Sequence, residues 1–154
     1  PGTRVGFEKI SLKGRALKLL AAREHSRAEL ERKLKPHEEE PGSLQVALDA
    51  LQAKGFINEQ RVLDSVIHRR AGKLGNARLK QELQAKGLDA SAVSQALAEL
   101  APGELARARE VWQKRYSNSP QTPEERAKQA RFLIARGFSG DVVRRVVSAA
   151  QDEL

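Results

Sequence analysis

The sequence predicts an all-α protein of three tandem three-helix repeats, stacked on one another into an elongated array. Strong helix formers fill most segments, whereas Val and Ile are sparse and never alternate over a long run, so no sheet is indicated. Apolar residues instead recur at the spacing of an amphipathic helix. One pattern also recurs at offsets of 49 and 50 residues, which aligns Leu34 with Leu83 and Leu133.

The constant offset favours stacked repeats over one compact bundle whose helices merely share a periodicity. The basic-glycine turns at Gly87 and Gly137 fall at the same point of the second and third copies. A unit of about 50 residues buries too small a fraction of its surface to be robust alone. Neighbouring units can cover each other's exposed apolar faces, which is the physical basis of repeat proteins.

The expected boundaries follow from this alignment. Residues 1–11 have weak periodicity and are interpreted as a loose N-terminal lead-in. Repeat 1 is expected at 12–57, repeat 2 at 58–101 and repeat 3 at 102–154. Each repeat should contain three helices and no strand.

In repeat 1, the first helix follows the start of the apolar pattern, and the second begins with a capping box. Ser26 can accept the backbone N–H at N3, while Glu29 can accept the N–H of the cap residue. Pro36 ends that helix, because the residue before a proline is pushed out of helical geometry. Ser43 is expected to cap the third helix, which ends at Gly55.

In repeat 2, Asn58 is expected to open the first helix. Gly72 and Gly75 bracket the break before the second helix, and Gly87 closes that helix. Asp89 is expected to cap the third helix, because a short acidic side chain can accept the free backbone N–H groups at a helix N-terminus.

In repeat 3, the second helix should begin with another capping box, with Thr122 as the cap, Pro123 at N1 and Glu125 at N3. Gly137 ends this helix, and Ser139 caps the last one. The glycines that end the second helices of repeats 2 and 3 each follow a basic residue and precede an apolar one. We expect both to be left-handed C-caps.

No pattern of catalytic residues or cofactor ligands is present. The chain has no cysteine and no G-x-x-x-x-G-K-[ST] or G-x-G-x-x-G loop that would cradle a phosphate. His25, His37 and His68 lack the spacing of metal ligands, so solvated or capping roles are expected. The acidic residues 38–40 lie in a Pro/Gly loop, where such a run is usually solvated. We therefore expect neither catalysis nor a cofactor or metal.

The balance of 28 Lys and Arg against 20 Asp and Glu gives a net charge of +8. This favours an anionic partner, such as nucleic acid or an acidic protein surface, although a basic protein without such a partner can have the same composition. No apolar run approaches the roughly 20 residues of a membrane span, and no signal peptide is visible. A cytoplasmic protein that does not bind membranes is expected.

Basic residues concentrate in two segments without interleaved acids, 68–80 and 126–136. A helix surface that only faces solvent usually gains from acid–base pairs one turn apart, so their absence suits an anionic partner. For 126–136, a solvated surface is an equally good interpretation. Stacked repeats should place equivalent residues along one side, which predicts a basic track of Arg69, Arg70, Lys73, Arg78, Lys86, Arg131, Arg136, Arg144 and Arg145.

Trp112 and Tyr116 lie one turn apart on an apolar face in the first helix of repeat 3. Aromatic residues at helical spacing dominate cores by the area they bury. Packing in the core is therefore favoured over stacking on nucleic-acid bases.

Several short motifs, taken in order, resemble the RecX family. In repeat 2 they are an arginine pair that ends a helix, a Leu-Gly turn, a basic–aliphatic pair, a Glu-Leu pair and a Lys-Gly turn: Arg69-Arg70, Leu74-Gly75, Arg78-Leu79, Glu82-Leu83 and Lys86-Gly87. In repeat 3 the match continues through Phe132-Leu133, Arg136 and Gly137-Phe138-Ser139. The order, number and spacing of these motifs over most of the chain make the resemblance specific.

The resemblance implies a curved array of three-helix units that binds the RecA–DNA filament and inhibits its ATP turnover, strand exchange and co-protease activity. The expected partners are the RecA filament and, weakly or through the filament, single- or double-stranded DNA. The chain itself is expected to be a monomer. Repeat 1 departs most from the family pattern, in its acidic turn at 37–40.

Two other functions remain open. A helical protein of helix-turn-helix type could bind DNA or RNA directly, since short helix pairs with glycine turns resemble that motif. The helix expected at 76–86 offers polar side chains for base reading: Asn76, Arg78, Lys80, Gln81 and Gln84. A passive scaffold could instead bind acidic protein partners.

Overall fold

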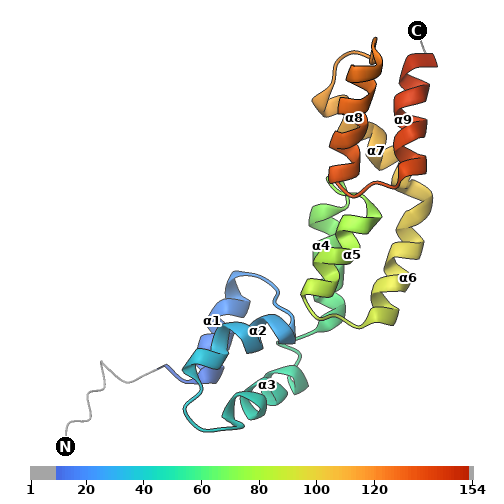
Figure 1. The fold of residues 1–154 in the computed structure, drawn as a ribbon. Helices are drawn as coiled ribbons and strands as arrows, with labels where there is room; N and C mark the ends of the chain where they lie inside the picture. Colours follow the sequence, from blue (N-terminus) through green and yellow to red (C-terminus); the bar gives the residue numbers. More distant parts are fainter. Residues whose placement is uncertain (1–9, 153–154) are drawn as a thin grey trace, which may run out of the picture. The chain divides into compact units, whose positions relative to one another are not determined.

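A computed structural model describes residues 10–152, with side chains described as far as Ser148. The all-α prediction is confirmed, because the described residues form nine α-helices and two 3-10 helices and contain no strand (Figure 1). The α-helices are α1 (Leu12–Ala22), α2 (Arg27–Leu34), α3 (Ser43–Ala53), α4 (Glu59–Arg70), α5 (Asn76–Ala85), α6 (Ala90–Leu100), α7 (Glu104–Arg115), α8 (Pro123–Ala135) and α9 (Gly140–Asp152). The 3-10 helices are η2 (Lys35–His37) and η3 (Ala101–Gly103).

The chain divides into two compact units, one on each side of the Val62–Leu63 bond. The expected lead-in at 1–11 lies outside the described residues, apart from Ile10 and Ser11. Ser11 is the N-cap of α1, and its side chain accepts the backbone N–H of Gly14 at 3.0 Å. In the described part of the chain, no helix combines the length and apolarity that crossing a membrane requires.

In the first unit, the three helices of repeat 1 bury one face each in a common core. The leucines of α3 recur at intervals of four and three residues, which places them on one side of the helix. The buried members of this core are Ala16, Leu30, Leu34, Leu44, Leu48, Leu51 and Ile57.

In the second unit, the core of repeat 3 is built around α9. Its valines occur in two adjacent pairs one turn apart, so they share one face, and α9 packs against α7 and α8. The buried members are Ala108, Val111, Leu133, Phe138, Val142, Val143, Val146 and Val147. In repeat 2, Leu79 and Leu83 of α5 and Val93 of α6 are buried at equivalent positions.

Several predicted helix caps are confirmed. The hydroxyl of Ser26 accepts the N–H of Glu29 at 3.1 Å, and the Glu29 carboxylate accepts the N–H of Ser26 at 3.0 Å, so the capping box is complete. Asp89 and Ser139 each accept the backbone N–H three residues further on, at the starts of α6 and α9. These caps depend on residues close together in the chain.

The cap predicted for α3 is wrong. Ser43 is the first residue of the helix, and the N-cap is Gly42, with a φ of 87°. The Glu38 carboxylate accepts the N–H of Leu44 at 2.9 Å and thereby supplies the capping oxygen. Its side chain is only 7 % exposed and pairs with Lys35 at 2.6 Å, so this member of the acidic turn is not solvated as expected.

The capping box predicted for α8 is present only in part. Thr122 accepts the N–H of Glu125 at 3.1 Å, as expected. The Glu125 carboxylate, however, accepts the N–H of Gln121 at 2.6 Å, which is one residue before the cap. The acidic side chain still satisfies a free N–H at the helix entrance.

The left-handed turns predicted after α5 and α8 are confirmed, with φ values of 72° at Gly87 and 92° at Gly137. At the end of α8, Gly137 donates its N–H to the carbonyl of Ile134 at 2.9 Å, and Phe138 donates to Leu133 at 3.3 Å. This is the Schellman pattern of C-capping. The buried Phe138 ring packs in the same cluster as Leu133, which fixes the turn against the helix.

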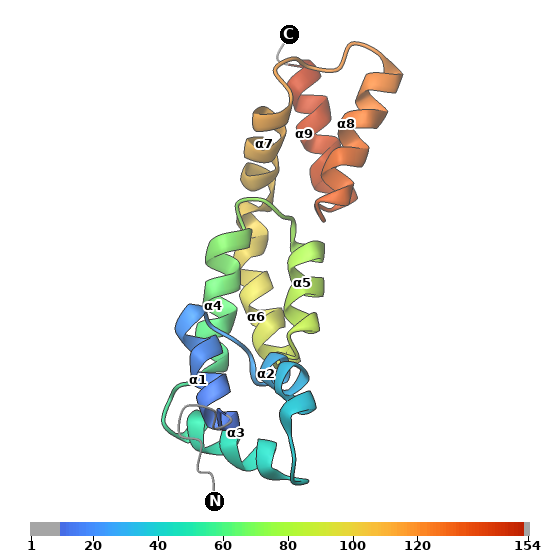
Figure 2. The ribbon, with the colours of Figure 1, turned by 90° about the vertical axis from the view of Figure 1, so that its left-hand side faces the viewer.

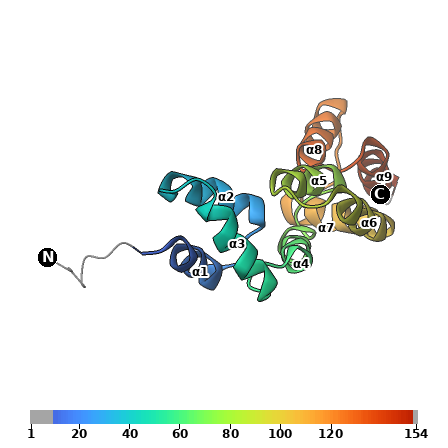
Figure 3. The same ribbon diagram turned by 90° about the horizontal axis from the view of Figure 1, so that it is seen from below.

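Repeats 2 and 3 meet where the end of α8 contacts the start of α5. Gly75 donates its N–H to the carbonyl of Arg136 at 2.8 Å, and Ala77 donates to Gly137 at 3.1 Å. Free carbonyl groups at one helix end are thus satisfied by free N–H groups at another. The equivalent helices α5 and α8 follow one another at this joint (Figures 1 and 3).

An acidic residue at the start of a repeat caps the second helix of the preceding repeat. Glu59 accepts the N–H of Arg27 at 3.2 Å, and Glu104 accepts the N–H of Asn76 at 2.9 Å. The two capped residues are 49 residues apart, which is the offset of the sequence repeat. This contact has no local signal in the sequence, because the residues of each pair are separated by about 30 positions.

Candidate functional site

The second unit contains a hollow of about 420 Å³ that is lined by four cationic side chains, and we call it the basic hollow. Lys73 comes from the turn between α4 and α5. Lys114 and Arg115 lie in the last turn of α7, and Arg136 follows α8. The other lining residues are Gly72, Val111 and Phe132.

Helices α7 and α8, which are joined by the loop of residues 116–122 (Figure 2), supply most of the lining of the basic hollow. Val111 and Arg115 lie one turn apart on α7, as do Phe132 and Arg136 on α8. The guanidinium carbons of Arg115 and Arg136 lie 5.8 and 5.0 Å from the centroid of the Phe132 ring. These distances fall within the range of cation–π attraction, so the ring helps to orient both guanidinium groups.

The four cations of the basic hollow have no acidic partner in the described part of the chain. Within the residues that the structure describes, none of their charged groups forms an ion pair with a carboxylate. Helices α4, α7 and α8 all end beside the hollow, and the negative ends of their dipoles partly offset the repulsion among the cations. The remaining positive potential favours an anionic ligand.

The aromatic residues beside the hollow pack on one another and on the core. The rings of Tyr116 and Phe132 meet edge to face, with centroids 5.6 Å apart and an interplanar angle of 89°. Trp112 packs against the core of repeat 3, and its indole N–H donates to the side chain of Gln129 at 2.8 Å. The expectation of core packing is confirmed for Trp112, whereas Tyr116 contacts the Phe132 ring, which itself packs against that core.

The structure brings two members of the predicted basic track, Lys73 and Arg136, together in the basic hollow. Two others make contacts within the fold. Arg70 donates two hydrogen bonds to the Glu82 carboxylate, at 3.2 and 2.9 Å, and this pairing raises the pKa of Arg70. Arg78 donates to the last carbonyl of α8 at 3.1 Å, so it reinforces the contact between repeats 2 and 3.

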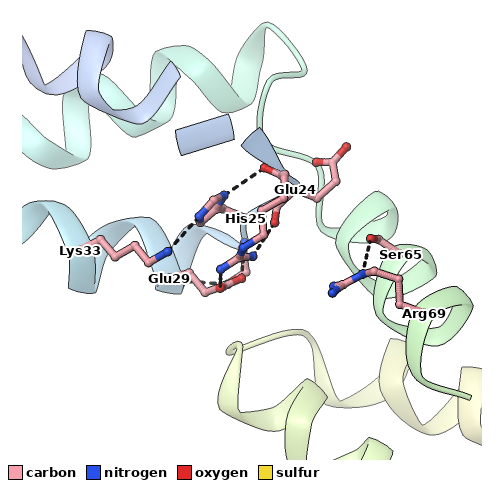
Figure 4. Close-up of polar contacts among 8 residues, drawn as sticks. Glu24, His25, Glu29, Lys33, Ser65 and Arg69 are labelled. Carbon is pink, nitrogen blue, oxygen red and sulfur yellow. Dashed lines mark hydrogen bonds and ion pairs between the residues drawn. The ribbon is translucent and has the colours of Figure 1, made fainter. Parts of the chain in front are cut away.

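The other five members of the track lie on the second unit but do not line the basic hollow. Four are exposed and the last is half-buried at the end of α5: Arg69, Arg131, Arg144, Arg145 and Lys86. The Arg69 side chain lies 3.4 Å from the hydroxyl of Ser65 (Figure 4). Arg144 pairs with the neighbouring acid of its own helix only at 3.5 Å.

Lys114 and Arg115 were not among the predicted site residues. The sequence does contain a signal, because these two cations are adjacent in "WQKRY" and are followed by an aromatic residue. Glu110, however, lies about one turn earlier on the same helix. With that acid nearby, the segment has the pattern of an ordinary mixed-charge surface.

His25 was expected to be solvated or to cap a helix, and the structure shows it buried, with its ring on the carbonyl of the C-cap residue of α1. The residue is 2 % exposed. Its Nδ1 lies 3.0 Å from the carbonyl oxygen of Arg23, and its Nε2 lies 3.0 Å from Nζ of Lys33 (Figure 4). Burial lowers the pKa of His25, and the charges of Arg23 and Lys33 act in the same direction. A neutral ring fits these contacts, with Nδ1 as donor and Nε2 as acceptor.

Comparison with family models matches all three repeats of the chain. Residues 13–51 match the first three-helix domain of RecX, residues 58–97 the second and residues 103–147 the third. Two solved structures have the same fold. A crystal structure of RecX from Lactobacillus salivarius covers 91 % of this chain and 94 % of its own, with a TM-score of 0.74 and 21 % identity. A crystal structure of a regulatory protein RecX has a TM-score of 0.74 and 22 % identity, with 92 % and 71 % covered.

Curated relatives are similar over almost their whole lengths. The regulatory protein RecX of Leptothrix cholodnii is 54 % identical over 144 residues, which cover 94 % of this chain and 92 % of the relative. The regulatory protein RecX of Ralstonia nicotianae is 47 % identical over 141 residues, with 92 % and 89 % covered.

Proposed function

The chain belongs to the RecX family, and from this premise we propose that it is a negative modulator of the RecA recombinase. It binds the RecA–DNA filament and inhibits the filament's ATPase, strand exchange and co-protease activities. It acts as a monomer in the cytoplasm and contacts DNA weakly or through the filament. It acts by binding alone, without a cofactor, a metal or a catalytic step of its own.

The observation that carries this proposal is the basic hollow. Four cations from both repeats of the second unit gather there without an acidic partner among the described residues. A nucleoprotein filament offers the complementary charge, as DNA phosphates and as acidic side chains of its protein subunits. Complementary charge accelerates association and fixes the orientation of the partners.

Direct reading of DNA or RNA bases by α5 is the second candidate function, and the contacts of its side chains count against it. Asn76 donates to the carbonyl of Leu97 at 3.1 Å and accepts from Arg107 at 2.7 Å. Arg78 is engaged with the end of α8. Two of the five polar residues that could have read bases are therefore held by the fold.

Co-sedimentation tests the proposal. RecA filaments are assembled on single-stranded DNA with a non-hydrolysed nucleotide and pelleted with the purified chain, beside the same DNA without RecA. We expect the chain to pellet with filaments far more than with DNA alone. Equal recovery with both would favour direct nucleic-acid binding, and absence from both pellets would contradict the proposal.

A further inference from the structure

We propose that the basic hollow receives an acidic protein segment of a RecA subunit, with an apolar side chain beside its carboxylates, and does not receive the DNA backbone. This inference rests on the proposed function and deepens it by naming the partner of one site.

The arrangement of charge suits carboxylates. Arg115 and Arg136 lie over the Phe132 ring at 5.8 and 5.0 Å. A guanidinium group that is held against a ring keeps the N–H groups of its edge available, and that edge matches the two oxygens of a carboxylate. Lys73 and Lys114 add two exposed ammonium groups on flexible stems, which can reach acids at variable positions.

The walls of the hollow favour a protein over DNA. Val111 and Phe132 present apolar surface between the cations, and an apolar side chain of a protein segment can bury itself against that surface. Proteins that bind single-stranded DNA without sequence preference combine cations with aromatic faces on which bases stack. The Phe132 ring already contacts two guanidinium groups and the Tyr116 ring, which leaves little of its face for a base.

The size of the hollow also favours a protein segment over the DNA backbone. A volume of about 420 Å³ is in the range of small-ligand sites, roughly 300–1,000 Å³. It can take a few side chains of an extended segment or of one helical turn. DNA contacts of the non-specific kind instead spread over many phosphates along an open surface.

A charge-reversal pair tests the location. Lys73→Glu with Lys114→Glu changes two exposed residues whose charged groups have no partner among the described residues, so it should leave the fold and the Phe132 contacts intact. The matched control is Arg32→Glu with Lys54→Glu, two exposed residues of the first unit with the same change in charge. Circular dichroism and thermal melts establish that both variants are folded.

The affinity of each variant is measured for RecA–DNA filaments and for single-stranded DNA alone. For filaments, we expect the hollow pair to lose affinity by about tenfold or more. The control pair should lose only about twofold, because exposed charges outside the contact act on the partner only through a field that salt screens. For DNA alone, both pairs should lose affinity to the same degree. Equal losses of filament affinity would overturn the assignment of the site.

Zero-length carbodiimide cross-linking identifies the chemical partner, because it joins a lysine amine to a carboxylate and not to a phosphodiester. With the wild-type chain on filaments, Lys73 or Lys114 should be linked to Asp or Glu of RecA in the mass spectrum. Links from other lysines only, or a selective loss of DNA binding in the hollow pair, would overturn the inference in favour of another site or of phosphate. A wild-type chain that does not bind filaments at all would instead refute the proposed function itself.

Discussion

Replacing Gly75 with alanine tests the joint between repeats 2 and 3. A Cβ atom at Gly75 would lie 2.3 Å from the backbone nitrogen of Phe138 and 2.4 Å from the carbonyl group of Gly137. These are backbone atoms, so the start of α5 and the end of α8 must move apart. At Gly72, in the same turn, an added Cβ would meet no atom within 4 Å, so Gly72→Ala is a matched control.

The magnitude follows from the contacts that this movement breaks. Gly75 and Ala77 donate the two backbone hydrogen bonds of the joint, at 2.8 and 3.1 Å. Losing both costs roughly 1–3 kcal/mol, and overpacking a tight site costs a similar ~1–3 kcal/mol. Both energies describe the same displacement and are not added, so we expect Gly75→Ala to lower the free energy of unfolding by about 2 kcal/mol. For a chain of this length, that lowers the melting temperature by roughly 4–8 °C. Gly72→Ala should leave stability unchanged or raise it by up to about 1 kcal/mol.

Fluorescence of the single tryptophan is the natural assay, since Trp112 lies in α7 and reports on the second unit. Thermal melts of the wild type and the two alanine variants are compared under one buffer condition. If the Gly75→Ala and Gly72→Ala variants have the same melting temperature, the backbones of repeats 2 and 3 are not in close contact at Gly75, and the reasoning is refuted.

Three further predictions concern single residues. Gly87 has a φ of 72°, so Gly87→Val should cost on the order of 1–2 kcal/mol; an unchanged melting temperature would show that the turn is not left-handed. Ser26→Ala removes the capping hydroxyl of α2 and should cost about 1 kcal/mol, measured as a lower urea midpoint by circular dichroism. Burial lowers the pKa of His25 below its ordinary 6.5, so the unfolded chain binds more protons than the folded chain. The stability from this group is complete above pH 6.5 and declines as the pH falls from there toward the lowered pKa. Urea midpoints across this range should show the decline, and it should be absent in His25→Gln.

The helices and most of their caps could be predicted because they depend on neighbouring residues. The capping box of Ser26 and Glu29 closes over three residues, and the glycine turn after α8 is set by the residue types on each side of it. The cap of α3 was missed because its oxygen comes from Glu38, six residues before the N–H that it accepts. Carboxylates that cap a helix from so far along the chain do not occur at a fixed sequence separation, so no sequence pattern indicates them.

The candidate site was only partly predictable because it combines distant residues. Lys73 and Lys114 belong to different repeats, and a stacking register has to be known before they can be placed together. Arg78 was predicted to face a partner, but its guanidinium group donates to Ala135, 57 residues further along the chain. A run of basic residues in the sequence does not distinguish cations that hold the fold together from cations that remain available.

The steady-state ATPase activity of RecA on single-stranded DNA tests whether the chain inhibits the filament through the basic hollow. The purified chain is titrated into the reaction at fixed RecA, DNA and ATP, with the Lys73→Glu, Lys114→Glu pair and the Arg32→Glu, Lys54→Glu pair in parallel. We expect the rate of ATP hydrolysis to fall as the wild-type chain is added and the control pair to inhibit nearly as well. The hollow pair should need about tenfold more protein for the same inhibition. A rate that stays constant at saturating wild-type chain would show that the chain does not inhibit RecA.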